Sequence, residues 1–448
     1  PLFVIDGFPI ENMDLNSINM NDVESISVLK DASSIAVYGS RAAAGVVIVT
    51  TKRGVESAPK FTYSHSTSYQ KDVNRVKVMN PYEYVKLMTE LDQQSGTPSA
   101  PSTKFSGIYI DPSKGYDLDY YKNVKALDWA EKLLQQGIIS NHSIKMIGGN
   151  KDTKYSLSGA LTDQKGIIIN TGMKRYDGKM TFDQKITKDL RLGVNAGYTN
   201  TTTFGTIPNA GNGGGVMYNM WGFRPVNGLS GGDLTGSPVD ETILADFSTG
   251  TSAIIPDNLV NPLQQAQNEY RLNVSNTANI TSFLEYSFWK KFKLKVSGGI
   301  SSTNVKAETF YNSKTSQGLL FVNSQGTVGN ANGINAQTSN ILNSSYLNEN
   351  TLTFKTTVNK KHLFDALTGF TYQYGKSYGY GFRSINIPQS EEQFGILSLN
   401  TGTPTTPLRL ATHNQLYSFI GRFNYTYDGK YLLTLSGRND GTSKLQPD

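Results

Sequence analysis

The side chains that could carry catalytic chemistry in this chain are few and widely spaced. Four histidines occur singly, without HExxH or other paired spacing, at His65, His142, His362 and His413. Because a zinc site needs several ligands at regular spacing, each histidine is better explained as a strand or turn residue. Cysteine is absent, which excludes a thiol nucleophile, and no serine stands in a GxSxG elbow. We therefore predict a protein that is not an enzyme and that holds no metal or cofactor.

Binding of nucleotides and nucleic acids is also disfavoured. Gly39 and Gly45 lie close together, but neither GxxxxGK[ST] nor GxGxxG spacing surrounds them. The 448 residues include 42 basic and 36 acidic side chains, so the net charge is +6 and only 17% of residues are charged. This balance is too weak for a surface that follows a phosphate backbone, and we expect no nucleic-acid partner.

One aromatic group has the chemistry to contact a solute. Tyr218, Trp221, Phe223 and Arg224 follow the glycine-rich residues 211–215. Exposed aromatic rings beside flexible glycines suit stacking on sugar rings or on peptide side chains. In the alternative and more economical interpretation, Trp221 and Phe223 only pack this loop onto the rim of the fold.

The elements that position these residues are strands with two unlike faces. Apolar and polar side chains alternate with period two, for example between Leu190 and Tyr198, which is typical of a half-buried strand. This alternation predicts about eleven strands, near residues 61–70, 140–149, 153–163, 174–186, 189–201, 271–288, 292–310, 346–358, 362–377, 412–427 and 430–440. One helical insertion is expected after the first strand, with Asn80 as its cap and Pro81 at its first position.

The connections between the predicted strands alternate in length. Short polar links lie near residues 150–153, 187–189, 290–291, 359–361 and 428–429, and longer loops near 201–269, 312–348 and 378–412. In an up-and-down meander all short turns then fall on one side, as in an outer-membrane barrel, whereas a β-sandwich follows no such rule. Aromatic residues beside the short turns suit an interfacial girdle, and they are Phe288, Trp289, Phe292, Tyr425, Tyr427 and Tyr431.

The predicted barrel is incomplete. The longest aliphatic run, residues 46–49, is far shorter than the roughly 20 residues of a membrane helix, but alternating strands can span a membrane. Eleven is an odd number of strands, and an open edge in lipid leaves backbone groups without hydrogen bonds. The chain also opens at Pro1 without an initiator Met, so we expect a fragment of a longer protein.

The N-terminal residues 1–54 follow another pattern. Residues 2–6, 23–29 and 46–51 are predicted strands, and residues 32–38 a short helix between Asp31 as cap and Gly39 as stop. A small α+β unit that leads directly into a barrel suggests a plug in its bore, with the barrel formed by residues 55–448.

Three segments of this unit resemble the plug signature of SusC/RagA-type TonB-dependent outer-membrane transporters. They are PLFVIDG at residues 1–7, NDVESISVLKDAS at 21–33 and YGSRAAAGVVIVTTK at 38–52. Ala42 and Ala44 replace the family's usual glycine and asparagine, which are small-for-small changes. The resemblance implies a plug motif formed by Asp6, Gly7, Glu24, Lys30, Asp31, Tyr38, Gly39, Arg41 and Gly45.

The resemblance also implies a fold and a function. The fold would be an all-β transmembrane barrel with a small N-terminal α+β plug domain, and this chain would supply about 11 of about 22 antiparallel strands. The protein would lie in outer-membrane lipid, receive a glycan or peptide from a SusD-like lipoprotein, and be energised by TonB with its inner-membrane complex. We expect the region of Lys30, Asp31 and Arg41 to hold the plug against the polar barrel wall.

Two other functions stay open at this point. A secreted or surface-exposed β-rich adhesin or glycan-binding module would carry polar residues on both faces of most strands. A passive porin would share the barrel, but porins are narrowed by their own loops, and the N-terminal unit disfavours this class.

Overall fold

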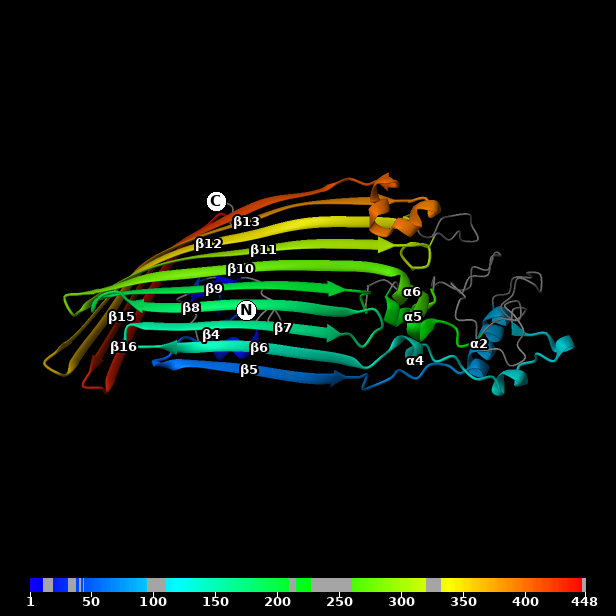
Figure 1. Ribbon diagram of the computed structural model, residues 1–448, viewed down its shortest axis with the longest axis horizontal. Helices are drawn as coiled ribbons and strands as arrows, with labels where there is room; N and C mark the ends of the chain where they lie inside the picture. Colours follow the sequence, from blue (N-terminus) through cyan, green and yellow to red (C-terminus); the bar gives the residue numbers. More distant parts are fainter. Residues whose placement is uncertain are drawn as a thin grey trace.

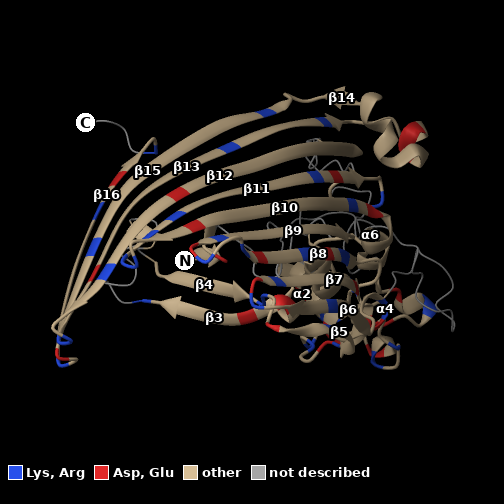
Figure 2. Ribbon diagram, turned by 60° about the vertical axis from the view of Figure 1, so that its left-hand side comes forward, with Lys and Arg blue, Asp and Glu red and all other residues tan. Residues whose placement is uncertain are grey.

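The computed structural model consists of two β-sheets, one large and strongly curved, the other small and placed within its concave side (Figures 1 and 2). The structure describes residues 1–10, 19–30, 38–39, 42, 44–94, 109–208, 215–226, 260–319 and 332–444. No helix among these residues is long and apolar enough to cross a membrane.

The small sheet belongs to the N-terminal unit. Its strands are β1 (Leu2–Ile5), β2 (Phe8–Ile10), β3 (Val23–Leu29) and β4 (Val46–Thr51), in the order β2-β1-β4-β3, and the short 3-10 helix η2 (Met20–Asp22) precedes β3. β1 and β4 pair in parallel, and Leu2, Val4, Ala42 and Val46 form a buried core. The strands confirm the predicted unit, with β2 as an addition. Of the predicted helix at residues 32–38, residues 32–37 and the cap Asp31 lie outside the described residues.

The large sheet is an antiparallel meander in which every long strand pairs with the next long strand along the chain. Its long strands are β5 (Ser57–Gln70), β6 (Gly137–Gly149), β7 (Thr153–Lys165), β8 (Gly172–Lys185), β9 (Leu190–Phe204), β10 (Glu269–Phe288), β11 (Phe292–Tyr311), β12 (Asn335–Val358), β13 (His362–Ile385), β15 (Leu408–Tyr427) and β16 (Tyr431–Thr442). A two-residue strand, β14 (Thr403–Pro404), pairs with the end of β13. All eleven predicted strands are therefore present, although several extend further than predicted.

The two ends of the large sheet differ, as the alternation of loop lengths predicts. The short turns lie together at the left in Figure 1, and the long connections with all their helices lie at the right. Three of the turns begin with two residues of positive φ, at Trp289–Lys290, Asn359–Lys360 and Asp428–Gly429. Such angles match the twist of the adjoining strands, which explains the sharp reversal there.

The two faces of the large sheet differ as well. Ile280, Leu284, Val296 and Ile300 lie on the outer face with 42–52% of their surface exposed. Aromatic rings gather beside the short turns, where Phe288 and Phe292 stack with centroids 5.3 Å apart. Exposed apolar side chains of this number need an apolar environment on that side.

The helices cover the end of the sheet opposite the short turns (Figure 1). They are α2 (Pro81–Gln94), η5 (Pro112–Lys114), η6 (Asp119–Lys122), α4 (Trp129–Leu133), α5 (Val216–Gly222), α6 (Pro262–Asn268) and η8 (Gln389–Asn400). The predicted start of α2 is confirmed, because Asn80 accepts a hydrogen bond from the amide of Glu83 and the Glu83 carboxylate accepts one from the amide of Asn80. This reciprocal capping box satisfies two amides that the helix cannot pair itself.

Candidate functional site

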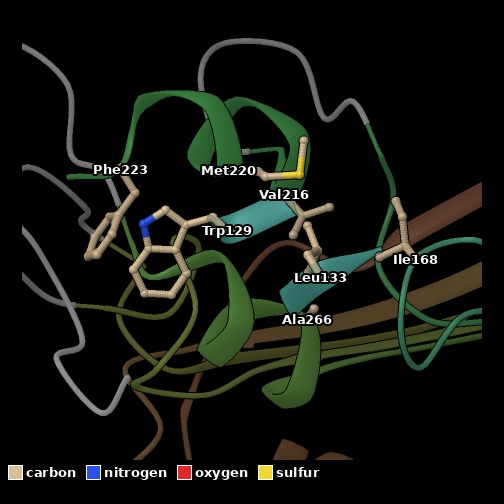
Figure 3. Close-up of a cluster of buried hydrophobic side chains, with 7 residues drawn as sticks. All are labelled: Trp129, Leu133, Ile168, Val216, Met220, Phe223 and Ala266. Atoms are coloured by element: carbon tan, nitrogen blue, oxygen red, sulfur yellow. The ribbon is translucent and has the colours of Figure 1, made fainter. Parts of the chain in front are cut away.

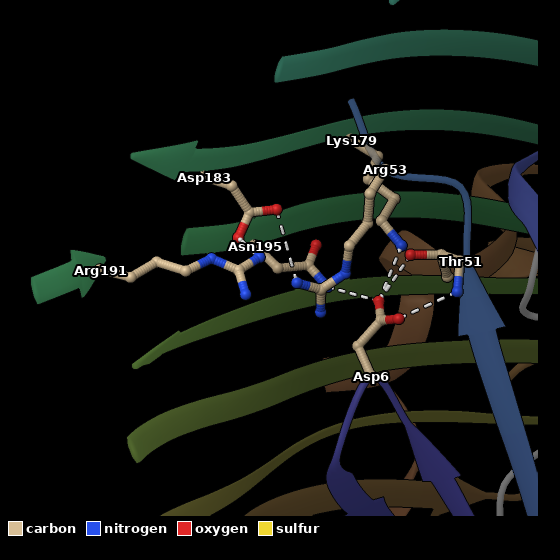
Figure 4. Close-up of polar contacts among 7 residues, drawn as sticks. All are labelled: Asp6, Thr51, Arg53, Lys179, Asp183, Arg191 and Asn195. Atoms are coloured by element: carbon tan, nitrogen blue, oxygen red, sulfur yellow. Dashed lines mark hydrogen bonds and ion pairs between the residues drawn. The ribbon is translucent and has the colours of Figure 1, made fainter. Parts of the chain in front are cut away.

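The N-terminal unit is fixed to the inner wall of the large sheet through the carboxylate of Asp6. Asp6 and Gly7 form the turn between β1 and β2 with φ of 48° and 90°. The turn projects the Asp6 side chain, which is 1% exposed, toward the wall. There Asp6 accepts hydrogen bonds from the Thr51 amide at 2.9 Å and hydroxyl at 2.6 Å, and from the Lys179 ammonium of β8 at 3.2 Å (Figure 4). The side-chain amide of Asn195 on β9 donates a further bond.

These partners decide the ionisation of Asp6. Burial by itself raises the pKa of this carboxyl, but the charge of Lys179 and the two donors of Thr51 outweigh burial, so the pKa lies below its ordinary value of 3.8. Asp6 is therefore ionised at neutral pH. A buried carboxylate of this kind is stable only while its donors and its counter-charge stay in place.

Two further ion pairs join the same side of the unit to the wall. Arg53, just after β4, lies 3.6 Å from Asp183 of β8, and Arg191 of β9 reaches the other oxygen of Asp183 at 2.9 Å (Figure 4). Asp22, before β3, lies 3.6 Å from the ammonium of Lys145 on β6. Among the described residues, the polar contacts thus concentrate on strands β6 to β9, and we name Asp6, Asp22, Arg53, Lys145, Lys179 and Asp183 the anchor residues.

On the opposite side, the described residues of the unit and the wall meet in close packing contacts. A Cβ atom at Gly299 of β11 would lie 2.6 Å from the ring of Phe8, so only glycine leaves room for Phe8 there. A Cβ atom at Gly39 would collide with Arg438 and Asp440, which pair with each other on β16. Burial raises the pKa of the neighbouring Tyr38, and the negative charge of Glu349 on β12 raises it further to a smaller extent. The N-terminal unit therefore touches the wall from β6 to β16.

A chamber of about 1090 Å³ lies between the unit and the wall. Ile5, Phe8, Asp22 and Thr51 contribute to it from the N-terminal unit. The wall contributes mainly Ser, Thr, Asn and Gln side chains of β9 to β13 and β15. Most lining residues are therefore polar in type, although more of the lining surface is apolar than polar, and they include two anchor residues, Asp22 of the unit and Lys179 of the wall.

Most, but not all, residues of the predicted plug motif lie among the described residues. Asp6 and Gly7 form the anchored turn, and Gly45 takes a φ of 88° just before β4. Glu24 and Lys30 are exposed, and no hydrogen bond or ion pair of theirs is found among the described residues. Asp31 and Arg41 lie outside the described residues, so their predicted contact with the wall stays a prediction. Tyr38 and Gly39 face β12 and β16 as described above.

The aromatic residues predicted to contact a solute divide into two groups. Phe223 is buried in a cluster at the loop end of the sheet, where its ring meets Trp129 edge to face at 5.2 Å (Figure 3). Arg224 stacks on the Phe223 ring at 5.9 Å, and its carbonyl accepts a bond from the Trp129 indole. Tyr218 and Trp221 on α5 are 38% and 45% exposed. Phe223 thus packs the loop, and Tyr218 and Trp221 have surface left for a solute.

Several residues of the site lay outside the sequence prediction. Lys179 and Asp183 lie on one face of β8, and nothing in the sequence paired them with Asp6 and Arg53. His65 and His142, treated as isolated residues, are stacked at 4.3 Å across β5 and β6. Among the described residues, no three acidic or histidine side chains are grouped to hold a metal ion.

The comparisons with known proteins agree with this arrangement. Residues 1–46 match the model of the TonB-dependent receptor plug domain. The whole chain is 29% identical to TonB-dependent receptor P26 of Formosa agariphila and 25% identical to TonB-dependent receptor SusC of Bacteroides thetaiotaomicron. It spans only 41% and 42% of the lengths of these two relatives.

Solved structures show the same fold. The structure of the RagAB peptide transporter superposes with a TM-score of 0.75 over 100% of this chain and 49% of that one, at 24% sequence identity. The ferric citrate transporter FecA superposes with a TM-score of 0.55 over 98% of this chain at 8% identity. The predicted fold, a partial antiparallel barrel with an N-terminal plug domain, is confirmed.

The first prediction concerns the Asp6 anchor. Asp6→Asn leaves the Lys179 ammonium without its counter-charge, so we expect local opening of the N-terminal unit to become about 2–3 kcal/mol easier. Amide hydrogen exchange at Thr51 in the full-length protein should then be about 30- to 100-fold faster. Glu56→Gln, which neutralises an exposed carboxylate, serves as the control. Equal exchange in both variants would contradict the anchoring role.

The second prediction concerns pH. Because the folded pKa of Asp6 lies below its ordinary value of 3.8, its stabilising contribution is complete above that value and is lost as pH falls through the folded pKa. Proteoliposomes with the full-length protein should keep a small dye from pH 7 to about pH 4.5 and leak progressively at lower pH. In Asp6→Asn this transition should be absent. A wild-type transition centred above pH 5 would exclude Asp6 as its cause.

The third prediction separates the two aromatic groups. Trp221→Ala removes a half-exposed ring, and we expect a weaker binding response from a panel of fluorescently labelled hexasaccharides and hexapeptides, read from the label, with unchanged thermal stability. Phe223→Ala creates a cavity in the buried cluster and should destabilise it by about 3 kcal/mol. An unchanged response to every panel member that the wild type binds would remove Trp221 from the set of solute contacts.

Proposed function

Because this chain carries a plug domain and is related along its whole length to TonB-dependent receptors, we propose that the full-length protein is a TonB-dependent importer of the outer membrane. Its solute is a glycan or a peptide, and a SusD-like lipoprotein delivers that solute at the extracellular face. The observation that carries the proposal is the anchored N-terminal unit inside the curve of the sheet.

The position of the unit suits a closed gate. Its polar contacts lie on β6 to β9, and its packing contacts reach β16, so it occupies the bore beside most of the described wall. A wide bore without such a unit would leak small solutes. The contacts are hydrogen bonds and ion pairs, whose polar groups can bond to water instead and reform their pairs when the unit moves.

The outer face of the sheet suits the membrane. Apolar side chains such as Ile280 and Leu284 are exposed there, and aromatic rings cluster at the short turns as in an interfacial girdle. We place the short turns in the periplasm and the helix-bearing loops outside the cell. In this orientation α5 with Tyr218 and Trp221 faces the arriving solute.

The energy source follows from the location. The outer membrane has no ATP supply, so work on the plug must arrive through a partner. We propose TonB with its inner-membrane complex as that partner. The protein would then act by moving a solute and not by changing it chemically.

The alternatives account for less of the structure. An adhesin or glycan-binding module in water would expose polar side chains on both faces, whereas one face here is apolar over several strands. A passive porin has no need of an anchored N-terminal unit. The importer is therefore the function that the geometry supports best.

The fourth prediction tests the proposed importer directly. Cells that produce the full-length protein should yield it in the outer-membrane fraction, extractable only with detergent. Uptake of fluorescently labelled oligosaccharide and peptide mixtures should fall to background when TonB is deleted. Release into aqueous buffer would exclude the barrel in the membrane, and uptake that persists without TonB would favour a passive pore.

A further inference from the structure

The outer face of β13 and β15 carries cations without anions toward its loop end. Lys376 of β13 and Arg409 and His413 of β15 are exposed, and their side chains have no hydrogen bond or ion pair among the described residues. On the premise of the outer-membrane location given above, we propose that these three residues, named the basic patch, bind the phosphate groups of a glycolipid of the outer leaflet.

The cross-strand register places the basic patch on the outer face. Ile300 of that face lies opposite Tyr346, and Tyr346 lies opposite Tyr374. Because side chains alternate along a strand and paired residues share a face, Lys376 follows Tyr374 on the outer face. His413 lies directly opposite Lys376, and its ring centroid is 6.5 Å from that of Tyr374.

Arg409 extends the patch away from the short turns. It lies opposite Tyr380, which is four positions beyond Lys376 and therefore on the same face. Four residues of a strand span about 13 Å, so the patch offers cations at two separate levels. This spacing suits a headgroup with more than one polar group and exceeds the reach of a single phosphate.

The position of Lys376 in the strand also explains its contact with the chamber. The lining of the chamber includes Gly375, Lys376 and Ser377 in succession. Since Lys376 shares the face of Tyr374, its two neighbours occupy the inward positions. Lys376 therefore borders the chamber through its main chain, and its ammonium belongs to the outer face.

No acidic side chain shares the outer face of β12, β13 and β15. The acidic residues of these strands are Glu349 and Asp365, and both occupy inward positions. Glu349 borders the small pocket beside Asp6, and Asp365 lies 3.8 Å from Lys355 of β12. The positive charge of the patch is therefore not compensated by its own strands.

Two other lysines of the outer face have a carboxylate partner. Lys174 of β8 lies 3.7 Å from Asp163 of β7. Lys306 of β11 lies 2.7 Å from Glu308 on the same strand. The basic patch differs from both in having three donors and no carboxylate, so its charge is available to an anion from outside the chain.

The distance from the short turns puts the patch at the level of lipid headgroups. The rings of Phe364 and Tyr425 lie 5.1 Å apart beside these turns. Lys376 is twelve positions beyond Phe364, and His413 is twelve positions before Tyr425. Twelve residues of a tilted strand rise about 30 Å, whereas the apolar band of a barrel is about 25 Å tall. With the short turns in the periplasm, the patch thus lies just outside the apolar band of the outer leaflet.

The chemistry of the patch and its surroundings fits a phosphorylated glycolipid. A guanidinium binds phosphate through two parallel hydrogen bonds, an ammonium acts as a point charge, and an imidazole adds a donor. Tyr378 and Tyr380, 50% and 45% exposed, bring hydroxyls that can bond to sugar rings. Closer to the short turns, Phe370 and Phe419 lie 5.1 Å apart on the same face, where acyl chains would pack. Free phosphate would use the cations and none of this apolar surface.

The fifth prediction is phosphate-dependent lipid binding by the purified full-length protein in detergent, measured by microscale thermophoresis. The probes are bisphosphorylated lipid A, the same lipid A after removal of both phosphates, and inorganic phosphate. We expect the bisphosphorylated form to bind at least tenfold tighter than the dephosphorylated form and to stay bound in 10 mM inorganic phosphate. Equal binding of the two lipids, or displacement by inorganic phosphate, would overturn the inference.

A matched pair of double variants locates the binding. Lys376→Gln with Arg409→Gln should weaken binding of bisphosphorylated lipid A at least tenfold and leave the dephosphorylated form unchanged. Lys165→Gln with Lys174→Gln removes the same charge from the outer face of β7 and β8 and should change binding less than twofold. Lys376→Arg with Arg409→Lys keeps both charges and should retain binding. Equal losses in the two glutamine variants, both with unchanged thermal stability, would exclude the basic patch as the site.

Failure of this inference and failure of the proposed function have different signatures. Lipid binding that does not depend on phosphate, in a protein whose uptake depends on TonB, would overturn the lipid site and leave the importer in place. Uptake that is independent of TonB would overturn the importer and leave the lipid site of a membrane barrel.

Discussion

The arrangement of the described residues depends on neutralising one buried carboxylate. Asp6 is 1% exposed, and its charge is balanced by Lys179 of β8 with donors from β4 and β9. These partners meet only when the small sheet and the large sheet are both folded and correctly placed. A slip of one residue in β8 would turn Lys179 to the outer face and leave Asp6 without its cation, so the anchor also selects the register of the wall.

The two-faced strands explain both environments of the large sheet. Side chains alternate across each strand, so the same segments supply apolar groups outside and hydroxyl and amide groups inside. The polar inner face is what allows the N-terminal unit to be held by ion pairs and hydrogen bonds.

Local signals predicted the elements well and their ends less well. The predicted cap at Asn80 depends on neighbouring residues and is confirmed, and the structure adds the reciprocal bond from the amide of Asn80 to Glu83. β12 begins at Asn335, eleven residues before the predicted start at 346, and β13 continues to Ile385. These extensions are rich in Asn, Ser, Gly and Tyr and are held by cross-strand pairing with each other and with β11, which side-chain alternation alone does not reveal.

The sequence by itself determined the two-faced strands, the alternation of short and long connections and the separate N-terminal unit, because each depends on residues close together in the chain. Only the tertiary structure decided which inward-facing groups meet. Asp6 and Lys179 are 173 positions apart, and Arg53 and Asp183 are also far apart along the chain. Their pairing depends on the curvature of the wall, on its register and on the docking of the small sheet, and no local pattern encodes any of these.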